Sequence, residues 1–173
     1  MKKLVSLLLL TAMAFALCAC GTKFEPVSKD SLVAALEQYF DYEEGVDFEV
    51  LEDYTLVPSD LQYQNGQRNT YNIECCIQRL AWDEDPDSPF IVYYVFRTQE
   101  DAREYFNTWR KYDGWGDWHN VDCRYDIVDI KGIHDINGYY LSDRMCFQIC
   151  TMGEADTTAA RNLLESLGLP VEM

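Results

Sequence analysis

The sequence predicts an α+β fold in which an antiparallel sheet packs against about three helices. Three segments repeat apolar residues at helical spacing, at residues 29–42, 99–112 and 156–167. Between them lie short segments rich in β-branched and aromatic residues, as strands are. The order indicates a helix followed by a short antiparallel meander, twice, and then a closing helix. This layout is either an internal duplication or a chance likeness of amphipathic helices.

Each predicted helix carries its own start or stop signal. Ser28 is the expected N-cap of the first helix, and Thr98 with Asp101 resembles a capping box at the start of the second. Gly168 and Pro170 are expected to end the third. The apolar stripes are Leu32, Val33, Leu36, Tyr39 and Phe40; Ala102, Tyr105, Phe106, Trp109 and Tyr112; and Ala160, Leu163, Leu164 and Leu167.

The strands are expected at residues 48–57, 72–80, 90–96, 124–131 and 145–151. In the second, alternation places Ile73, Cys75 and Ile77 on one side. The third is continuously apolar, which predicts a central strand that is buried on both faces. Asn137 and Gly138, between residues 133–136 and 139–141, predict a tight hairpin.

The first residues have the features of an export signal. Lys2 and Lys3 precede an apolar run at residues 4–17. That run is too short to span a bilayer comfortably, since a transmembrane helix needs about 20 apolar residues. It fits the apolar region of a signal peptide, and it ends in Leu17-Cys18-Ala19-Cys20-Gly21.

This ending resembles the lipobox of bacterial lipoproteins, with an aliphatic residue three before the cysteine and a small residue just before it. The resemblance implies that signal peptidase II cuts before Cys20, which carries a diacylglyceryl thioether. Cys18 stands where Ser, Thr or Ala is more frequent. The alternative is an ordinary secretory signal or a single anchor helix. We therefore expect a signal peptide at residues 1–19, a lipidated tether at 20–27 and one domain at 28–173, held on the extracytoplasmic face of the cell membrane.

The charge balance excludes several classes of partner. The chain has 14 basic and 30 acidic residues, and loss of residues 1–19 removes two lysines, which leaves 12 basic residues and a net charge of −18. A strongly acidic domain is not expected to bind nucleic acid, whose phosphates need a basic face. The same charge argues against adhesion to anionic headgroups beyond the lipid itself.

Five cysteines follow the lipidation site, and their pairing stays open. They are Cys75, Cys76, Cys123, Cys146 and Cys150. An odd number leaves at least one thiol free. Cys76 reaching Cys123 or Cys150 on a neighbouring strand is one possibility. The other, which the irregular spacing favours, is that all five are free, buried thiols.

Asp83, Asp85 and Asp87 have the alternate spacing with which calcium loops present carboxylates. The EF-hand pattern then fails, since Pro86 intrudes and Ser88 stands where the turn needs glycine. The main interpretation is a solvated acidic loop between two strands. No cofactor is expected, and calcium is the alternative at this loop.

Trp115 and Trp118 lie in a glycine-containing loop, where aromatic side chains can stack on sugar rings or fill a groove on a partner. The alternative is that they cover the end of the sheet. His119 and His134 have no spacing that predicts a metal site or a catalytic triad.

Three functions remain open from the sequence. The first is a non-enzymatic, membrane-tethered domain that binds a protein or carbohydrate partner, because no catalytic constellation is recognised. The second is a carrier of a small molecule or metal ion, which requires a pocket. The third is a hydrolase that uses a carboxylate pair that the sequence does not single out.

Overall fold

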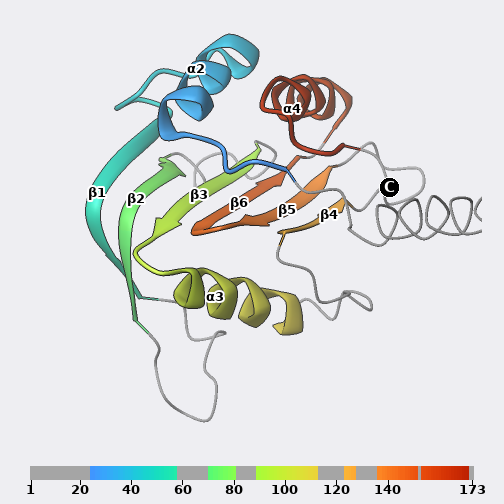
Figure 1. The fold of residues 1–173 in the computed structure, drawn as a ribbon. Helices are drawn as coiled ribbons and strands as arrows, with labels where there is room; N and C mark the ends of the chain where they lie inside the picture. The colour runs from blue at the N-terminus through green and yellow to red at the C-terminus, as the bar shows by residue number, and fades with distance from the viewer. Residues whose placement is uncertain are drawn as a thin grey trace, which may run out of the picture.

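The structure is a computed structural model that describes residues 24–57, 70–80, 89–112, 123–127, 136–151 and 153–171. Three helices and six strands lie in these ranges (Figure 1). In chain order they are α2 (Lys29–Phe40), β1 (Phe48–Leu56), β2 (Tyr71–Arg79), β3 (Phe90–Phe96), α3 (Gln99–Tyr112), β4 (Cys123–Ile127), β5 (Asn137–Ser142), β6 (Met145–Cys150) and α4 (Glu154–Ser166).

The six strands form one antiparallel sheet in the order β1-β2-β3-β6-β5-β4. Each half of the sheet is a meander of three consecutive strands, and β3 pairs with β6 where the halves meet. The predicted α+β class and the order of helix and meander are confirmed. β3 is a central strand and is buried along most of its length, as its apolar run predicts.

Helices cover both faces of the sheet. Figure 1 shows α2 and α4 on one face and α3 on the other. Each helix packs residues of its apolar stripe against the sheet, so the described residues form two cores, one on each face. The upper core lies under α2 and α4 and contains Leu36, Tyr93 and Leu164 among others. The lower core lies against α3 and contains Phe96 and Tyr105.

An approximate twofold rotation relates the two meanders in strand order, but it does not relate the helices. The strand order is symmetric about an axis normal to the sheet between β3 and β6. Such a rotation keeps each face of the sheet on itself, so it would place α2 and α3, the helices that precede the two meanders, on the same face. They lie on opposite faces (Figure 1). The rotational likeness is therefore limited to the strands.

β1 and β2 change face together near their middle. Asp53 of β1 has a left-handed backbone with φ of 51°. The register of β2 against β3 shifts between Ile73 and Cys75, which makes Glu74 an extra residue. As a result Ile73 lies in the lower core and Cys75 in the upper core. The prediction that Ile73, Cys75 and Ile77 share one side is wrong at Ile73, because the bulge reverses the alternation there.

The predicted Asn137-Gly138 hairpin is also wrong. Both residues are inside β5, where Gly138 pairs with Ile149 on one side and with Ile127 on the other. A Cβ at Gly138 would lie 2.8 Å from a ring carbon of Tyr140, so close packing explains this glycine. The turn that joins β5 to β6 comes later and contains Asp143, with φ of 52°.

Local signals account for the helix ends. The Ser28 side chain accepts a hydrogen bond from the backbone N–H of Ser31 and caps α2, and Thr98 likewise accepts from Asp101 at the start of α3. α2 ends two residues before the expected position, because Asp41 turns into the left-handed region with φ of 58°.

Candidate functional site

Most residues that the sequence singles out lie outside the described residues. These are Cys20, Asp83, Asp85, Asp87, Trp115, Trp118, His119 and His134. The structure instead describes the start of the folded domain, just after the predicted lipidation site, and the end of the sheet beside it. These two features form the candidate site.

The segment of residues 24–27, here called the N-terminal strap, is part of the folded domain. Phe24 and Val27 are each 7% exposed and belong to the upper core. In Figure 1 the strap crosses the sheet in dark blue, on the face that carries α2 and α4. The predicted boundary, with a tether to residue 27 and a domain from residue 28, is therefore four residues too late.

Polar contacts also hold the strap on the sheet. The hydroxyl of Tyr93 donates to the carbonyl of Val27 at 2.8 Å, and the Ser142 hydroxyl donates to the carbonyl of Phe24 at 3.0 Å. The Val27 N–H lies 3.2 Å from the sulfur of Met145. These partners sit on β3, β5 and the start of β6, so the strap satisfies its backbone groups with side chains of the sheet.

Burial beside the strap also affects ionisation. It raises the pKa of the Tyr93 phenol well above its ordinary value, because the charged phenolate would lose its contact with water. The ring of Phe24 meets that of Tyr140 edge to face, with centroids 5.8 Å apart. Lys23, Glu25 and Pro26 surround Phe24 in the sequence, and its partners lie more than a hundred residues away. Sequence patterns near the strap therefore gave no signal of its burial.

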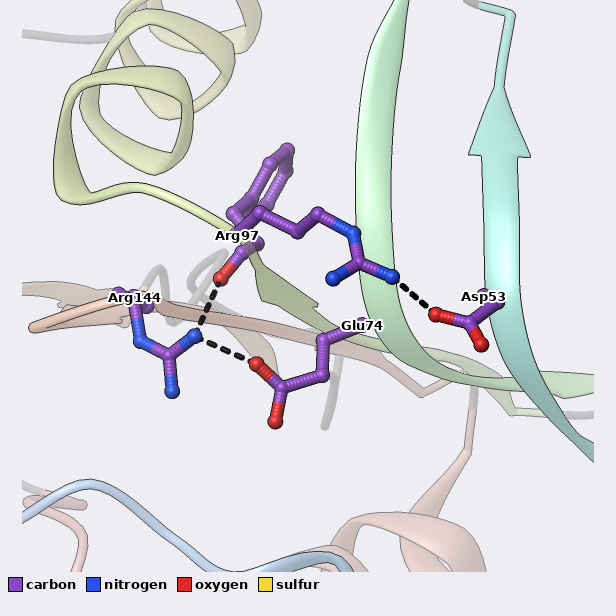
Figure 2. Close-up of polar contacts among 5 residues, drawn as sticks. Asp53, Glu74, Arg97 and Arg144 are labelled. Carbon is purple, nitrogen blue, oxygen red and sulfur yellow. Dashed lines mark hydrogen bonds and ion pairs between the residues drawn. The ribbon is translucent and has the colours of Figure 1, made fainter.

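Two ion pairs join neighbouring elements at the end of the sheet where β2 and β6 begin (Figure 2). Arg97, just after β3, pairs with Asp53 of β1. Arg144, in the turn between β5 and β6, lies 2.5 Å from Glu74 of β2 and also donates to the Phe96 carbonyl at 3.2 Å. Asp53 and Glu74 are the two residues at which β1 and β2 change face, so the bulge brings their carboxylates toward the arginines.

A third pair lies nearby on the upper face. Lys29, at the start of α2, lies 2.9 Å from Glu52 of β1. This contact raises the pKa of Lys29 and lowers the pKa of Glu52, through the hydrogen bond first and the charge attraction second. We call this region the arginine end of the sheet, defined by Lys29, Arg97 and Arg144 with their three acidic partners.

The cysteines whose side chains the structure describes form no disulfide and are mostly buried. Cys75, Cys76, Cys146 and Cys150 remain thiols, as the irregular spacing favoured. A Cys76 bridge to Cys150 is excluded by the strand order, because β3 lies between their strands and two strand spacings amount to about 10 Å, beyond disulfide reach. Cys123 lies on β4, further still from Cys76.

Burial makes these thiols poor nucleophiles. It raises the pKa of Cys76 to about 12 and raises the pKa of Cys146 further. It also raises the pKa of Cys75, although the Lys29 ammonium acts in the opposite direction. Cys146 donates to the Ala102 carbonyl at 3.4 Å, which ties the middle of the sheet to α3.

A small apolar pocket lies between α3 and the sheet. Its free volume is about 20 Å³, which holds about one water molecule and is far below the several hundred Å³ of organic ligand sites. Among its lining residues are Val92, Tyr94, Tyr105, Phe106, Tyr139 and Cys146. This pocket offers no room for a carried small molecule.

Two further findings apply to the described ranges alone. Among those residues, no three histidine, cysteine or acidic side chains gather closely enough to hold a metal ion. None of the helices α2, α3 and α4 has the length and apolar character needed to cross a bilayer.

Comparison with known proteins adds no relative. No protein-family model matches the chain, and no curated protein matches it in sequence.

Proposed function

We propose that this chain is a membrane-anchored, extracytoplasmic lipoprotein whose domain binds a partner and does not catalyse a reaction. The observation that carries the proposal is the sequence Leu17-Cys18-Ala19-Cys20, which follows an apolar run of signal-peptide length. Two acyl chains on Cys20 would anchor the protein stably, since each buried methylene contributes about 0.8 kcal/mol.

The position of the strap supports the proposal. Phe24 is buried, and it follows Cys20 by four positions in the sequence. A domain that begins so soon after a lipidated cysteine is held at the membrane surface, because each residue extends the chain by at most about 3.6 Å. Binding to a partner at or near that surface suits such a placement.

The described chemistry supports binding over catalysis. Thiols are the strongest potential nucleophiles among the described side chains, and burial holds Cys75, Cys76 and Cys146 in their protonated, unreactive form. The pocket beside α3 is too small for a substrate. A surface patch fits these observations better than a cleft, and Trp115 with Trp118 stays the predicted patch for a protein or carbohydrate partner.

Anchoring is tested by comparing two cysteine variants in the bacterium. Cys20→Ala should move the protein from the detergent phase to the aqueous phase on detergent partition, and it should abolish labelling by radioactive palmitate. Cys18→Ala is the matched control, because it changes a neighbouring cysteine and should leave both readouts unchanged. Palmitate retained in Cys20→Ala would contradict the proposal.

Binding is tested on the folded protein with a panel of immobilised glycans. Trp115→Ala with Trp118→Ala should abolish retention, whereas Trp82→Ala, the same change beside the predicted acidic loop, should not. Thermal unfolding should give the same midpoint for all three proteins. A calcium-dependent rise of that midpoint, lost in Asp85→Asn, would instead support the carrier function.

A further inference from the structure

The strand β1 forms one margin of the sheet and has a free outer edge. It pairs with β2 on its inner side, and no described helix or strand lies along its outer side (Figure 1). With 9 residues β1 is long for a strand, since about 5–6 is usual. A strand in this position presents backbone N–H and C=O groups that another strand can pair with.

Two hydrogen bonds show which backbone groups of β1 point outward. The carbonyl of Asp47 accepts a hydrogen bond at 2.9 Å from the N–H of Leu80, on the side of β2. The carbonyl of Phe48, the next residue, accepts one at 2.7 Å from the N–H of Gly45. Successive residues of a strand direct their backbone groups to opposite sides, so the Phe48 carbonyl faces away from β2.

The same alternation defines the open stretch of the edge. It places the N–H and carbonyl of Val50 and the N–H of Glu52 on the outer side. Gly45 already occupies the Phe48 carbonyl before this stretch. After it, Asp53 turns the strand through a left-handed backbone with φ of 51°. The open stretch therefore suits a short extended segment and not a whole second sheet.

Exposed apolar side chains accompany this edge. Among the described residues, the exposed large apolar side chains include Val46 and Val57, which bracket β1 and are 61% and 40% exposed. Between them Val50, Leu51 and Tyr54 are only half-buried. An added strand would cover apolar surface that water now contacts, and exposed apolar surface with a polar rim is typical of interaction sites.

The charge around the edge is negative after the nearby cations are counted. Lys29 and Arg97 pair with carboxylates of β1, and Arg79, at the end of β2, packs over the ring of Tyr42. Against these three cations, β1 and the connection before it carry seven carboxylates. They are Asp41, Glu43, Glu44, Asp47, Glu49, Glu52 and Asp53. The excess favours an occupant that carries basic residues.

A second copy of this chain is a poorer occupant. Antiparallel pairing through the outward groups of Val50 and Glu52 in both copies would centre on Leu51. That pairing would bring Glu49 of each copy toward Asp53 of the other. Like charges directly opposite each other destabilise a pair of strands.

We propose that the free edge of β1 binds a short, basic, extended segment of a partner protein, which adds a strand to the sheet. The inference rests on the proposed binding function, but not on Cys20, Trp115 or Trp118. Main-chain hydrogen bonds to Val50 and Glu52 align the segment. Its basic side chains meet the excess of carboxylates, and its apolar ones cover the half-buried side chains of β1.

The probe is a short synthetic peptide of alternating lysine and valine, added to the full-length protein in an uncharged detergent. The peptide should bind with a Kd below about 1 mM. Amide hydrogen exchange, followed by NMR, should slow several-fold at Val50 and Glu52. It should not change at Glu49 and Leu51, whose N–H groups face β2. The same peptide with glutamate in place of lysine is the control and should not bind.

Two variants separate the backbone of β1 from its side chains. Val50→Pro removes an outward N–H and leaves the pairing with β2 in place, so it should weaken binding about tenfold. Val50→Ala keeps that N–H and should weaken binding far less. A lysine–valine peptide that is N-methylated at every residue repeats the test on the unchanged protein, and it should not bind.

Three results would overturn the proposal. They are unchanged exchange at Val50 and Glu52 with the lysine peptide, equal binding of the glutamate peptide, and dimers of the free protein that dissociate in Val50→Pro. Retention on glycans through Trp115 and Trp118 is measured separately. Failure of the β1 test with glycan retention intact would therefore leave the proposed function standing.

Discussion

The hydroxyl of Tyr93 donates a 2.8 Å hydrogen bond to the carbonyl of Val27, 66 positions earlier in the chain. This bond joins the centre of the sheet to the strap that follows the predicted lipidation site. It holds residues 24–27 against the core of the domain. The strap is therefore the first feature to test by mutation.

Removal of the strap should destabilise the domain strongly. A chain that begins at residue 28 should unfold with about 4 kcal/mol less free energy than one that begins at residue 21, since burial of Phe24 and Val27 contributes about 1.5–3 kcal/mol each. Urea denaturation followed by tryptophan fluorescence measures the difference. Equal midpoints for the two chains would show that the strap does not belong to the core.

Removal of the Tyr93 hydroxyl tests its contact with Val27. Tyr93→Phe should lower the free energy of unfolding by about 1–3 kcal/mol, because it leaves the buried Val27 carbonyl without its donor. Tyr39→Phe removes a hydroxyl from a half-buried tyrosine on α2 and should change the stability by less than about 0.5 kcal/mol. The account fails here if both variants behave alike.

The left-handed backbone at Asp53 predicts a difference between two substitutions that both remove its carboxylate. Asp53→Gly and Asp53→Ala each lose the pairing with Arg97, but alanine in the left-handed region costs about 1 kcal/mol more than glycine. Asp53→Ala should therefore be the less stable protein in urea. The reverse order would mean that β1 is regular at this position.

The Lys29–Glu52 pair should stabilise the folded state at neutral pH and lose this effect both in acid and in alkali. Folding lowers the pKa of Glu52, so its contribution is present above the ordinary pKa of glutamate and is lost as the pH falls through the folded value. Folding raises the pKa of Lys29, so its contribution is present below the ordinary pKa of lysine and is lost as the pH rises through the folded value.

A double-mutant cycle with Lys29→Met and Glu52→Gln measures this coupling. The coupling energy should be favourable at neutral pH and should vanish in acid, well below the ordinary pKa of glutamate. A coupling of the same size at both pH values would assign it to packing of the side chains and not to charge.

The raised pKa of Cys76, about 12, predicts slow alkylation of the native protein. At pH 8 about one thiol in ten thousand would be ionised, compared with about a quarter at an ordinary pKa near 8.5. Iodoacetamide with peptide mass mapping should modify half-buried Cys150 before Cys75, Cys76 and Cys146, and urea should remove the difference. Rapid native alkylation of Cys76 would contradict the structure.

The elements that the sequence predicts well are those whose signals are local. The helix at residues 99–112 and the strand at 90–96 match the structure at both ends, since Thr98 caps the helix and the strand is apolar throughout. The bulge was not predictable, because the residues around Glu74 alternate regularly in the sequence. Only the pairing with β3 shows that Glu74 is an extra residue.

The candidate site could not be read from spacing. Asp53 and Arg97 are 44 positions apart, and Glu74 and Arg144 are 70 apart, so strand order alone brings them together. The strap escaped prediction for the same reason, since Phe24 packs on Tyr140. The resemblance of residues 17–21 to a lipobox, by contrast, depends on neighbouring residues alone, so it can be recognised in the sequence.

The most direct test of the central claim is the mass of the mature protein, purified from membranes of the bacterium that makes it. The account predicts a chain that begins at Cys20 and carries a diacylglyceryl group on that sulfur, with the added mass located on the first peptide. A mature chain that begins elsewhere, or an unmodified Cys20, would contradict it.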